Sequence, residues 1–145
     1  MAPAKSRLKA EPPTILVIDD DMDARRMYAE YLRVNRCIAF TAADGRSGID
    51  KTNDLCPDVV VLDLAMPRVD GWTVLKHLRE SSWTENIPIV VVTAVGESRD
   101  SAYQAGCDAY LTKPCVPETL WLQIRAILRW QAAHARRGER RPATT

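Results

Sequence analysis

The sequence has no apolar run long enough to cross a membrane. Its longest apolar stretches fall far short of the roughly 18 residues that a membrane-spanning helix requires. The amino-terminal segment MAPAKSRLKAEPP also lacks the apolar stretch that follows the basic residues of a secretory signal. We therefore expect a soluble, cytoplasmic protein with no membrane insertion.

Motifs for zinc binding and thiol redox chemistry are also missing. The four cysteines are widely spaced and form no CxxC motif: Cys37, Cys56, Cys107 and Cys115. This spacing argues against a metal-thiolate or disulfide-exchange site, so we expect reduced, mostly buried thiols. The two histidines, His77 and His134, stand alone in the sequence. We expect both to be solvated and neither to be a phosphohistidine site.

Length and charge leave room for one domain. The chain has 145 residues, of which 46% are hydrophobic and 27% charged, and its net charge is +1; such a composition is typical of a single globular domain. Residues 1–13 and 132–145 carry +2 and +3, so residues 14–131 carry −4. The two basic ends lack apolar periodicity and aromatic residues, which predicts flexible tails without direct nucleic-acid binding. We therefore expect no output domain after residue 131, because the residues that follow are too few to bury a core.

Short apolar runs that end at polar residues predict a parallel sheet. Three runs of four β-branched or leucine residues are present: 15–18, 59–62 and 89–92. Their length and lack of polar alternation favour strands buried on both faces. Asp19 and Asp20 follow the first run, Asp63 the second and Thr93 the third. Because the carboxyl ends of parallel strands share one edge, where ligands bind in open α/β sheets, we expect these four side chains to converge.

Between these runs the apolar residues take the helical period. Ala24, Tyr28 and Leu32 mark the first helix, with Asp21 or Asp23 as its N-cap. We predict further elements at 37–41 (strand), 45–54 (helix after Asp44), from Gly71 (helix), 97–106 (helix), 109–112 (strand) and from Pro117 (helix). Five βα units with right-handed crossovers predict a doubly wound, five-stranded parallel sheet, a flavodoxin-like three-layer α/β sandwich.

Three carboxylates at one sheet edge predict a metal site. Asp19, Asp20 and Asp63 would repel one another without a cation, and an oxygen-only cluster suits Mg²⁺ or Mn²⁺. Helix capping is the simpler explanation for one aspartate, but it does not account for three at two strand ends. Asp63 ends the most continuous apolar strand and is our candidate nucleophile for an aspartyl phosphate.

A cation and a hydroxyl complete the candidate site. Lys113, next to Pro114 after the fifth predicted strand, can bring an ammonium group to a phosphoryl oxygen or to Asp63. Thr93 can donate a hydroxyl hydrogen bond, and Ala94 leaves space beside it for phosphate access.

The motifs ILVIDD, VVVLDLAMPRVDGW, IVVVTA and YLTKP resemble, in order and spacing, the receiver domain of two-component response regulators. The resemblance covers residues 14 to about 130 and is with the single-domain, chemotaxis-regulator-like type. It implies that Asp63 is the phosphoacceptor and that Asp20, Asp63 and the backbone carbonyl of Ala65 ligate Mg²⁺, with Asp19 acting through water. It also implies that Thr93 and Lys113 bind the phosphoryl group, that the Lys113–Pro114 bond is cis, and that Thr93 and Tyr110 form a conformational switch.

The implied function is signalling. A sensor histidine kinase or phosphotransfer protein would phosphorylate Asp63, and the surface formed by residues 97–130 would then bind a downstream protein or form a phosphorylation-dependent homodimer. Ala65 and Val95 cannot orient a hydrolytic water, which predicts slow self-dephosphorylation. Trp83, Trp121 and Trp130 are candidate partner anchors, whereas Trp72 is expected to pack locally.

Three other functions remain as alternatives. A Mg²⁺-dependent aspartyl-phosphate phosphohydrolase would need an additional acid/base and a cap domain or insertions, and the sequence offers no such cap. A flavodoxin-like nucleotide binder would need a Gly-rich phosphate loop after the first strand, which is missing. A constitutive, unphosphorylated receiver-like scaffold is compatible with the sequence, although the complete set of site residues argues against it. We therefore expect a signalling phosphoacceptor rather than an enzyme that acts on an external substrate.

Overall fold

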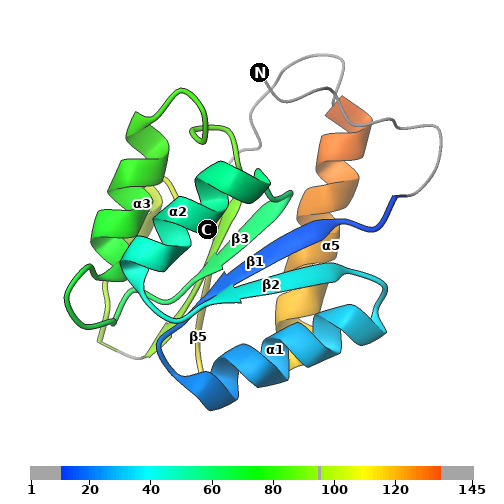
Figure 1. Cartoon of the computed structure of the whole chain (residues 1–145), viewed down its shortest axis with the longest axis horizontal. Helices are drawn as coiled ribbons and strands as arrows, with labels where there is room; N and C mark the ends of the chain where they lie inside the picture. Colours follow the sequence, from blue (N-terminus) through cyan, green and yellow to red (C-terminus); the bar gives the residue numbers. More distant parts are fainter. Residues whose placement is uncertain (1–10, 95, 135–145) are drawn as a thin grey trace.

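The computed structural model describes residues 11–94 and 96–134, in which strands and helices alternate along the chain (Figure 1). The strands are β1 (Thr14–Ile18), β2 (Ile38–Ala42), β3 (Val59–Leu62), β4 (Ile89–Ala94) and β5 (Ala109–Lys113). The helices are α1 (Met22–Val34), α2 (Gly45–Leu55), α3 (Gly71–Glu80), α4 (Arg99–Ala105) and α5 (Pro117–His134). All strand pairs are parallel, in the order β2-β1-β3-β4-β5.

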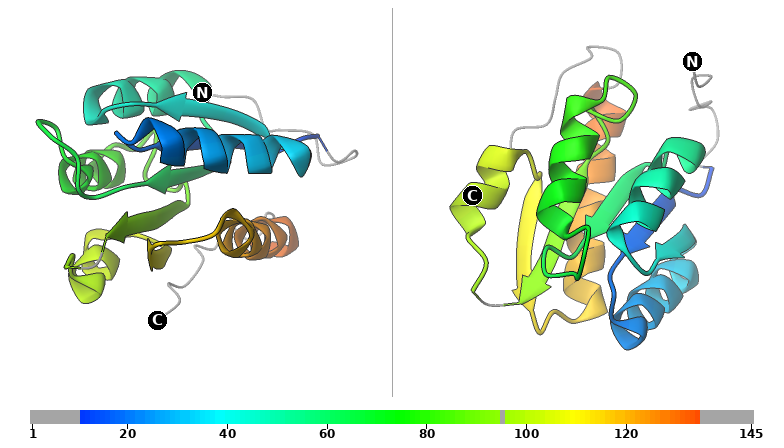
Figure 2. Two further views of the ribbon diagram at one scale, coloured as in Figure 1. Left: turned by 90° about the horizontal axis from the view of Figure 1, so that it is seen from below. Right: turned by 60° about the vertical axis from the view of Figure 1, so that its left-hand side comes forward.

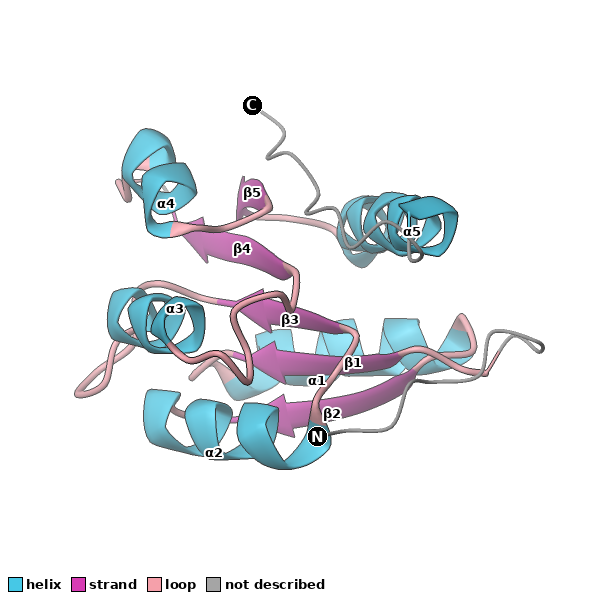
Figure 3. Ribbon diagram, turned by 90° about the horizontal axis from the view of Figure 1, so that it is seen from above, coloured by secondary structure: helices cyan, strands magenta, loops and turns pink. Residues whose placement is uncertain are grey.

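Helices cover both faces of this sheet (Figure 3). Successive residues of a strand point to opposite faces, so Ile15 and Val17 belong to the core on the side of α1 and α5, while Leu16 and Ile18 belong to the core on the side of α2, α3 and α4. In the right-hand view of Figure 2, α4, α3 and α2 stand side by side in that order. Two apolar cores separated by the sheet therefore confirm the predicted doubly wound, three-layer sandwich.

Capping residues set where most helices begin. The Asp21 carboxylate accepts from the backbone N–H of Asp23 at the start of α1, which decides between the two predicted caps, Asp21 and Asp23. Asp44 accepts from Ser47 at the start of α2, as predicted. Asp70 and Ser98 cap α3 and α4 in the same way. These side chains satisfy N–H groups that have no partner within the helix.

Some boundaries differ from those that the sequence predicts. Strand β2 is shifted by one residue, to 38–42, and α4 is shorter than the predicted 97–106 because Ser98 caps its start and Gly106, at a φ of 111°, ends it. Helix α5 continues to His134, which lies inside the predicted tail 132–145. His134 was expected to be solvated in that tail, but its ring stacks on Trp130 with centroids 4.2 Å apart. Residues 1–10 and 135–145 of the predicted tails lie outside the described residues.

A buried ion pair joins the amino ends of β4 and β5. The Arg79 guanidinium lies 2.9 Å from the Asp108 carboxylate, and their side chains are only 10% and 6% exposed. Arg79 also donates to the carbonyls of Gly106, Glu85 and Ile87. The same Asp108 oxygen accepts from the backbone N–H of Ile89, 2.8 Å away. This cluster therefore connects α3 to the start of two strands.

Two further sequence expectations can be compared with the described residues. All four cysteines are free, and three of them are buried, as expected; Cys56 is half-buried. No helix within residues 11–94 and 96–134 is long and apolar enough to cross a membrane.

Candidate functional site

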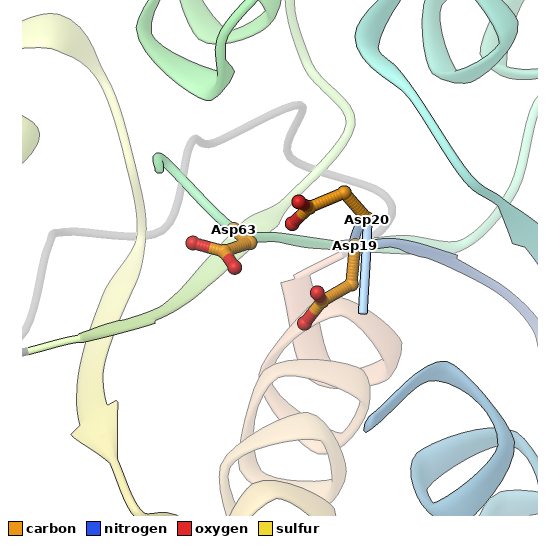
Figure 4. Close-up of side chains that lie close together, drawn as sticks. All are labelled: Asp19, Asp20 and Asp63. Carbon is orange, nitrogen blue, oxygen red and sulfur yellow. The ribbon is translucent and has the colours of Figure 1, made fainter. Parts of the chain in front are cut away.

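The predicted site residues meet at the carboxyl edge of the sheet. Asp19 and Asp20 follow β1, Asp63 follows β3, Thr93 lies near the end of β4, and Lys113 is the last residue of β5. The chain order reverses between β1 and β3, and such switch points are where open α/β sheets bind ligands. Figure 4 shows the three carboxylates gathered at this edge.

Hydrogen bonds hold the Asp63 carboxylate in one orientation. Its Oδ1 accepts from the backbone N–H of Ala65 and from the Thr93 hydroxyl, both 2.9 Å away. Its Oδ2 accepts from the Lys113 ammonium at 3.1 Å. The Asp63 residue is only 5% exposed. This buried carboxylate at a strand end thus has three hydrogen-bond donors.

The loop after Asp63 requires a glycine. The backbone N–H of Gly71 donates to the Leu64 carbonyl at 3.0 Å, so the first residue of α3 lies directly against the Asp63–Leu64 backbone. A Cβ atom at position 71 would lie 2.1 Å from the Asp63 carbonyl oxygen. Only glycine permits this close approach, which places the positive end of α3 next to the site.

Lys113 links two of the three carboxylates. Its ammonium lies 2.7 Å from Asp19 Oδ2, closer than to Asp63. Burial acts to lower the pKa of Lys113, but the hydrogen bonds and charges of Asp19 and Asp63 outweigh it, so the pKa is raised overall. Burial raises the pKa of Asp19, and the bonds from Lys113 and from the Asp21 N–H oppose this only in part.

The acidic cluster fits a divalent cation. One carboxylate oxygen from each of Asp19, Asp20 and Asp63 can be chosen so that all three lie within 4.8 Å of one another. Asp19 and Asp63 are buried and Asp20 is exposed, so the cluster is open to water on one side. Hard oxygen donors in an open site suit Mg²⁺, which keeps several waters and shares a phosphate oxygen. The role of the Ala65 carbonyl as a further ligand stays a prediction.

The Tyr110 side chain is turned into the protein. Tyr110 is 7% exposed, and its hydroxyl donates to the Glu97 carbonyl at 2.9 Å. The Glu97 carboxylate in turn accepts from the Trp72 indole N–H at 3.1 Å. Trp72 packs against the core beside its own helix, as expected, and in addition reaches the loop before α4. Thr93 and Tyr110 are therefore both buried, whereas Ala94, which follows Thr93, is exposed.

The other tryptophans differ in exposure. Trp83 is 48% exposed, whereas Trp121 is half-buried and packs against the core between the sheet and α1 and α5. Trp130 is half-buried and stacks on His134. Of the three candidate anchors, Trp83 is thus the one on the open surface.

One contact at the site was missed by sequence reasoning. The Arg25 guanidinium donates to the Asp19 backbone carbonyl at 2.9 Å. In the sequence, this contact could have been inferred only from a basic residue, Arg25, in the first turn of the helix that follows Asp19 and Asp20. Such a signal is weak, because basic residues occupy most exposed helix faces.

Comparison with known proteins defines the family. The model of the response regulator receiver domain matches residues 15–125, and the chain therefore belongs to this family. It is 38% identical over 119 residues to the DNA-binding dual master transcriptional regulator RpaA of Synechocystis sp., covering 81% of this chain and 49% of that protein. It is 36% identical over 117 residues to the phosphate regulon transcriptional regulatory protein PhoB of Escherichia coli, covering 79% and 51%. The chain thus spans about half the length of these relatives.

Solved structures of response regulators match this chain over nearly their whole length. The chemotaxis response regulator CheY4 of Vibrio cholerae superimposes with a TM-score of 0.75 at 28% identity, covering 80% of this chain and 98% of that one. A putative response regulator from Chloroflexus aurantiacus gives a TM-score of 0.76 at 31% identity, covering 81% and 98%. This protein is therefore a receiver domain of a two-component response regulator in both sequence and fold.

Proposed function

We propose that this receiver accepts a phosphoryl group on Asp63 from a phosphohistidine of a sensor histidine kinase or phosphotransfer protein. The observation that carries the proposal is the environment of Asp63. Its carboxylate accepts hydrogen bonds from Lys113, Thr93 and the Ala65 N–H. It is also part of the acidic cluster that fits Mg²⁺. A bare carboxylate becomes an effective nucleophile toward phosphorus only when such groups neutralise the phosphoryl oxygens.

In the transfer, an Asp63 oxygen forms a bond to phosphorus while the bond from phosphorus to the donor nitrogen breaks. The electron pair of the broken bond remains on the donor imidazole. Lys113, which now lies 3.1 Å from Asp63, shifts its ammonium toward a phosphoryl oxygen. The Thr93 hydroxyl and the Ala65 N–H donate to the same group. When bound by Asp19, Asp20 and Asp63, Mg²⁺ supplies charge neutralisation of the phosphoryl oxygens.

A cleft beside Lys113 offers a place for the donor. It has a volume of about 380 Å³ and lies between α1 and the connection from β5 to α5. Its lining combines two acidic side chains of the first α1 turn with Met27 and Val116, which are 42% and 63% exposed. Exposed apolar groups next to the site favour a protein donor over a small molecule alone.

The output surface is proposed to be residues 97–130, which comprise α4, β5 and most of α5. Tyr110 lies within this surface, and its hydroxyl donates to the Glu97 carbonyl immediately before the Ser98 cap of α4. A downstream protein is the proposed partner, with a phosphorylation-dependent homodimer as the alternative. The proposal does not extend to DNA binding, since RpaA, the relative whose name includes DNA binding, is about twice as long as the region that matches this chain.

The phosphorylated state is proposed to be long-lived. Ala65 is exposed two residues after the phosphoacceptor, and its methyl group cannot orient an attacking water. Val95, the second position in this argument, lies outside the described residues.

The proposal is tested by intact-mass spectrometry after incubation with acetyl phosphate and Mg²⁺. We expect an adduct of roughly 80 Da, one phosphoryl group, that is lost in Asp63→Asn and in excess chelator. Asp54→Asn, an exposed aspartate on α2, is the matched control and should be modified like the wild type. An adduct that survives in Asp63→Asn would refute the assignment of Asp63. Absence of any adduct would favour the constitutive scaffold.

A further inference from the structure

Asp20 differs from the other two carboxylates of the cluster in how it is held. Asp19 accepts bonds from Lys113 and the Asp21 N–H, and Asp63 accepts from three donors. Among residues 11–94 and 96–134, no hydrogen bond or ion pair to the Asp20 carboxylate is found, and Asp20 is exposed. Its position in the cluster therefore depends on its backbone.

The backbone at Asp20 is held by Arg25. The Asp19 carbonyl, which accepts from the Arg25 guanidinium at 2.9 Å, belongs to the peptide unit that joins Asp19 to Asp20. Because a peptide unit is planar, holding its oxygen restricts both ψ of Asp19 and φ of Asp20, and so the direction of the Asp20 side chain. The backbone N–H of Arg25 donates to the Asp21 carbonyl at 3.0 Å, as any residue at this position of α1 would. The half-buried Arg25 side chain thus ties the first turn of α1 to the residue after β1 through the Asp19 carbonyl alone.

We propose that Arg25 is a positioning residue for the metal site and that it raises the affinity for Mg²⁺ through Asp20. The inference rests on the proposed Mg²⁺ site. It predicts an effect opposite in sign to that of charge alone, because a guanidinium near the cluster repels a divalent cation. If Arg25 acted only through its charge, its removal would strengthen Mg²⁺ binding; if it positions Asp20, its removal weakens binding.

The expected change in Mg²⁺ affinity can be taken from other residues that orient metal ligands. Outer partners that orient metal ligands change metal affinity by about 10-fold to 100-fold when removed. Arg25 acts on one of three carboxylates and through the backbone, so we expect the low end, about 10-fold. Arg25→Lys should lie between the wild type and Arg25→Met, because an ammonium can reach the carbonyl but lacks the rigid planar donor geometry of a guanidinium.

The test is calorimetric titration of the metal-free protein with Mg²⁺ alone. Variants are Arg25→Met, Arg25→Lys and the control Arg26→Met, which removes the same charge from the neighbouring position, where the side chain is 71% exposed. We expect the dissociation constant of Arg25→Met to rise about 10-fold and that of Arg26→Met to change less than about 2-fold. Urea unfolding in chelator compares the stability of the variants, so that a general loss of structure is recognised.

A second readout separates positioning from catalysis. The rate of phosphorylation by acetyl phosphate, measured against Mg²⁺ concentration, should need more Mg²⁺ for half-saturation in Arg25→Met but reach nearly the wild-type rate at saturation. Equal or tighter Mg²⁺ binding by Arg25→Met would overturn the inference. Should that variant not fold, Arg25→Lys decides, since binding identical to the wild type would overturn the inference and weaker binding would support it. Failure of the wild type itself to bind Mg²⁺ would remove the proposed metal site, a distinguishable result.

Discussion

Replacing Asp108 by alanine should destabilise the fold without impairing phosphorylation. The substitution removes the carboxylate partner of Arg79, whose side chain is only 10% exposed, and leaves the Ile89 N–H without its acceptor. Removing one partner of a buried ion pair costs roughly 3–5 kcal/mol, because the other charge remains buried. Arg79 keeps its bonds to the carbonyls of Gly106, Glu85 and Ile87, which places the expected loss near about 3 kcal/mol.

The assay is urea unfolding of the wild type and Asp108→Ala, with the free energy of unfolding as the measured quantity. The matched control is Asp50→Ala, which breaks the exposed pair between Arg46 and Asp50, 3.5 Å apart with side chains 80% and 60% exposed. That control should lose less than about 0.5 kcal/mol, because solvent screens exposed pairs. A domain of this size has about 5–15 kcal/mol of stability in total, so the expected difference is measurable.

Phosphorylation of Asp108→Ala should remain close to that of the wild type under conditions where the variant is folded. Asp108 precedes β5, whereas Lys113 ends it, so the ion pair and Asp63 lie at opposite ends of the sheet. A loss of stability below about 1 kcal/mol, close to the effect of exposed pairs, would refute the reasoning. A clearly lower phosphorylation rate of folded Asp108→Ala would refute the claim that the ion pair and the Asp63 site act independently.

Three further outcomes are expected. Gly71→Ala should lower both stability and the phosphorylation rate, because its Cβ would lie 2.1 Å from the Asp63 carbonyl oxygen; unchanged unfolding and phosphorylation curves would contradict this. Ala65→Asn should shorten the lifetime of phospho-Asp63, measured by intact mass after removal of the donor, since an amide can orient water; an equal or longer lifetime would exclude the explanation. Burial raises the pKa of Cys107 to about 12, so its contribution to stability is present below the unfolded-state pKa near about 8.5 and is lost as pH rises toward the folded value. The free energy of unfolding of Cys107→Ala should therefore fall less steeply than that of the wild type above pH 9 or so, and equal slopes would argue against the shift.

The sequence by itself determined which residues meet at the functional edge. Short apolar runs without polar alternation favour strands buried on both faces of a parallel sheet, and parallel strands bring their carboxyl ends together. Asp19, Asp63, Thr93 and Lys113 are far apart in the chain but each lies at a strand end, so their convergence follows from local pattern alone. The helix starts at Asp21 and Asp44 were predictable for a similar reason, because a capping side chain acts on N–H groups only two or three residues away.

Only the tertiary structure decided the contacts between side chains and distant backbone. The bond from Arg25 to the Asp19 carbonyl, the path from Trp72 through Glu97 to Tyr110, and the burial of Arg79 with Asp108 depend on how helices pack on the sheet. Arginine, aspartate and glutamate are mostly exposed in proteins, so sequence pattern does not distinguish the few that turn inward. A polar side chain finds its partner only after packing has brought the two within hydrogen-bond distance, and there a shift of one ångström decides whether the bond exists.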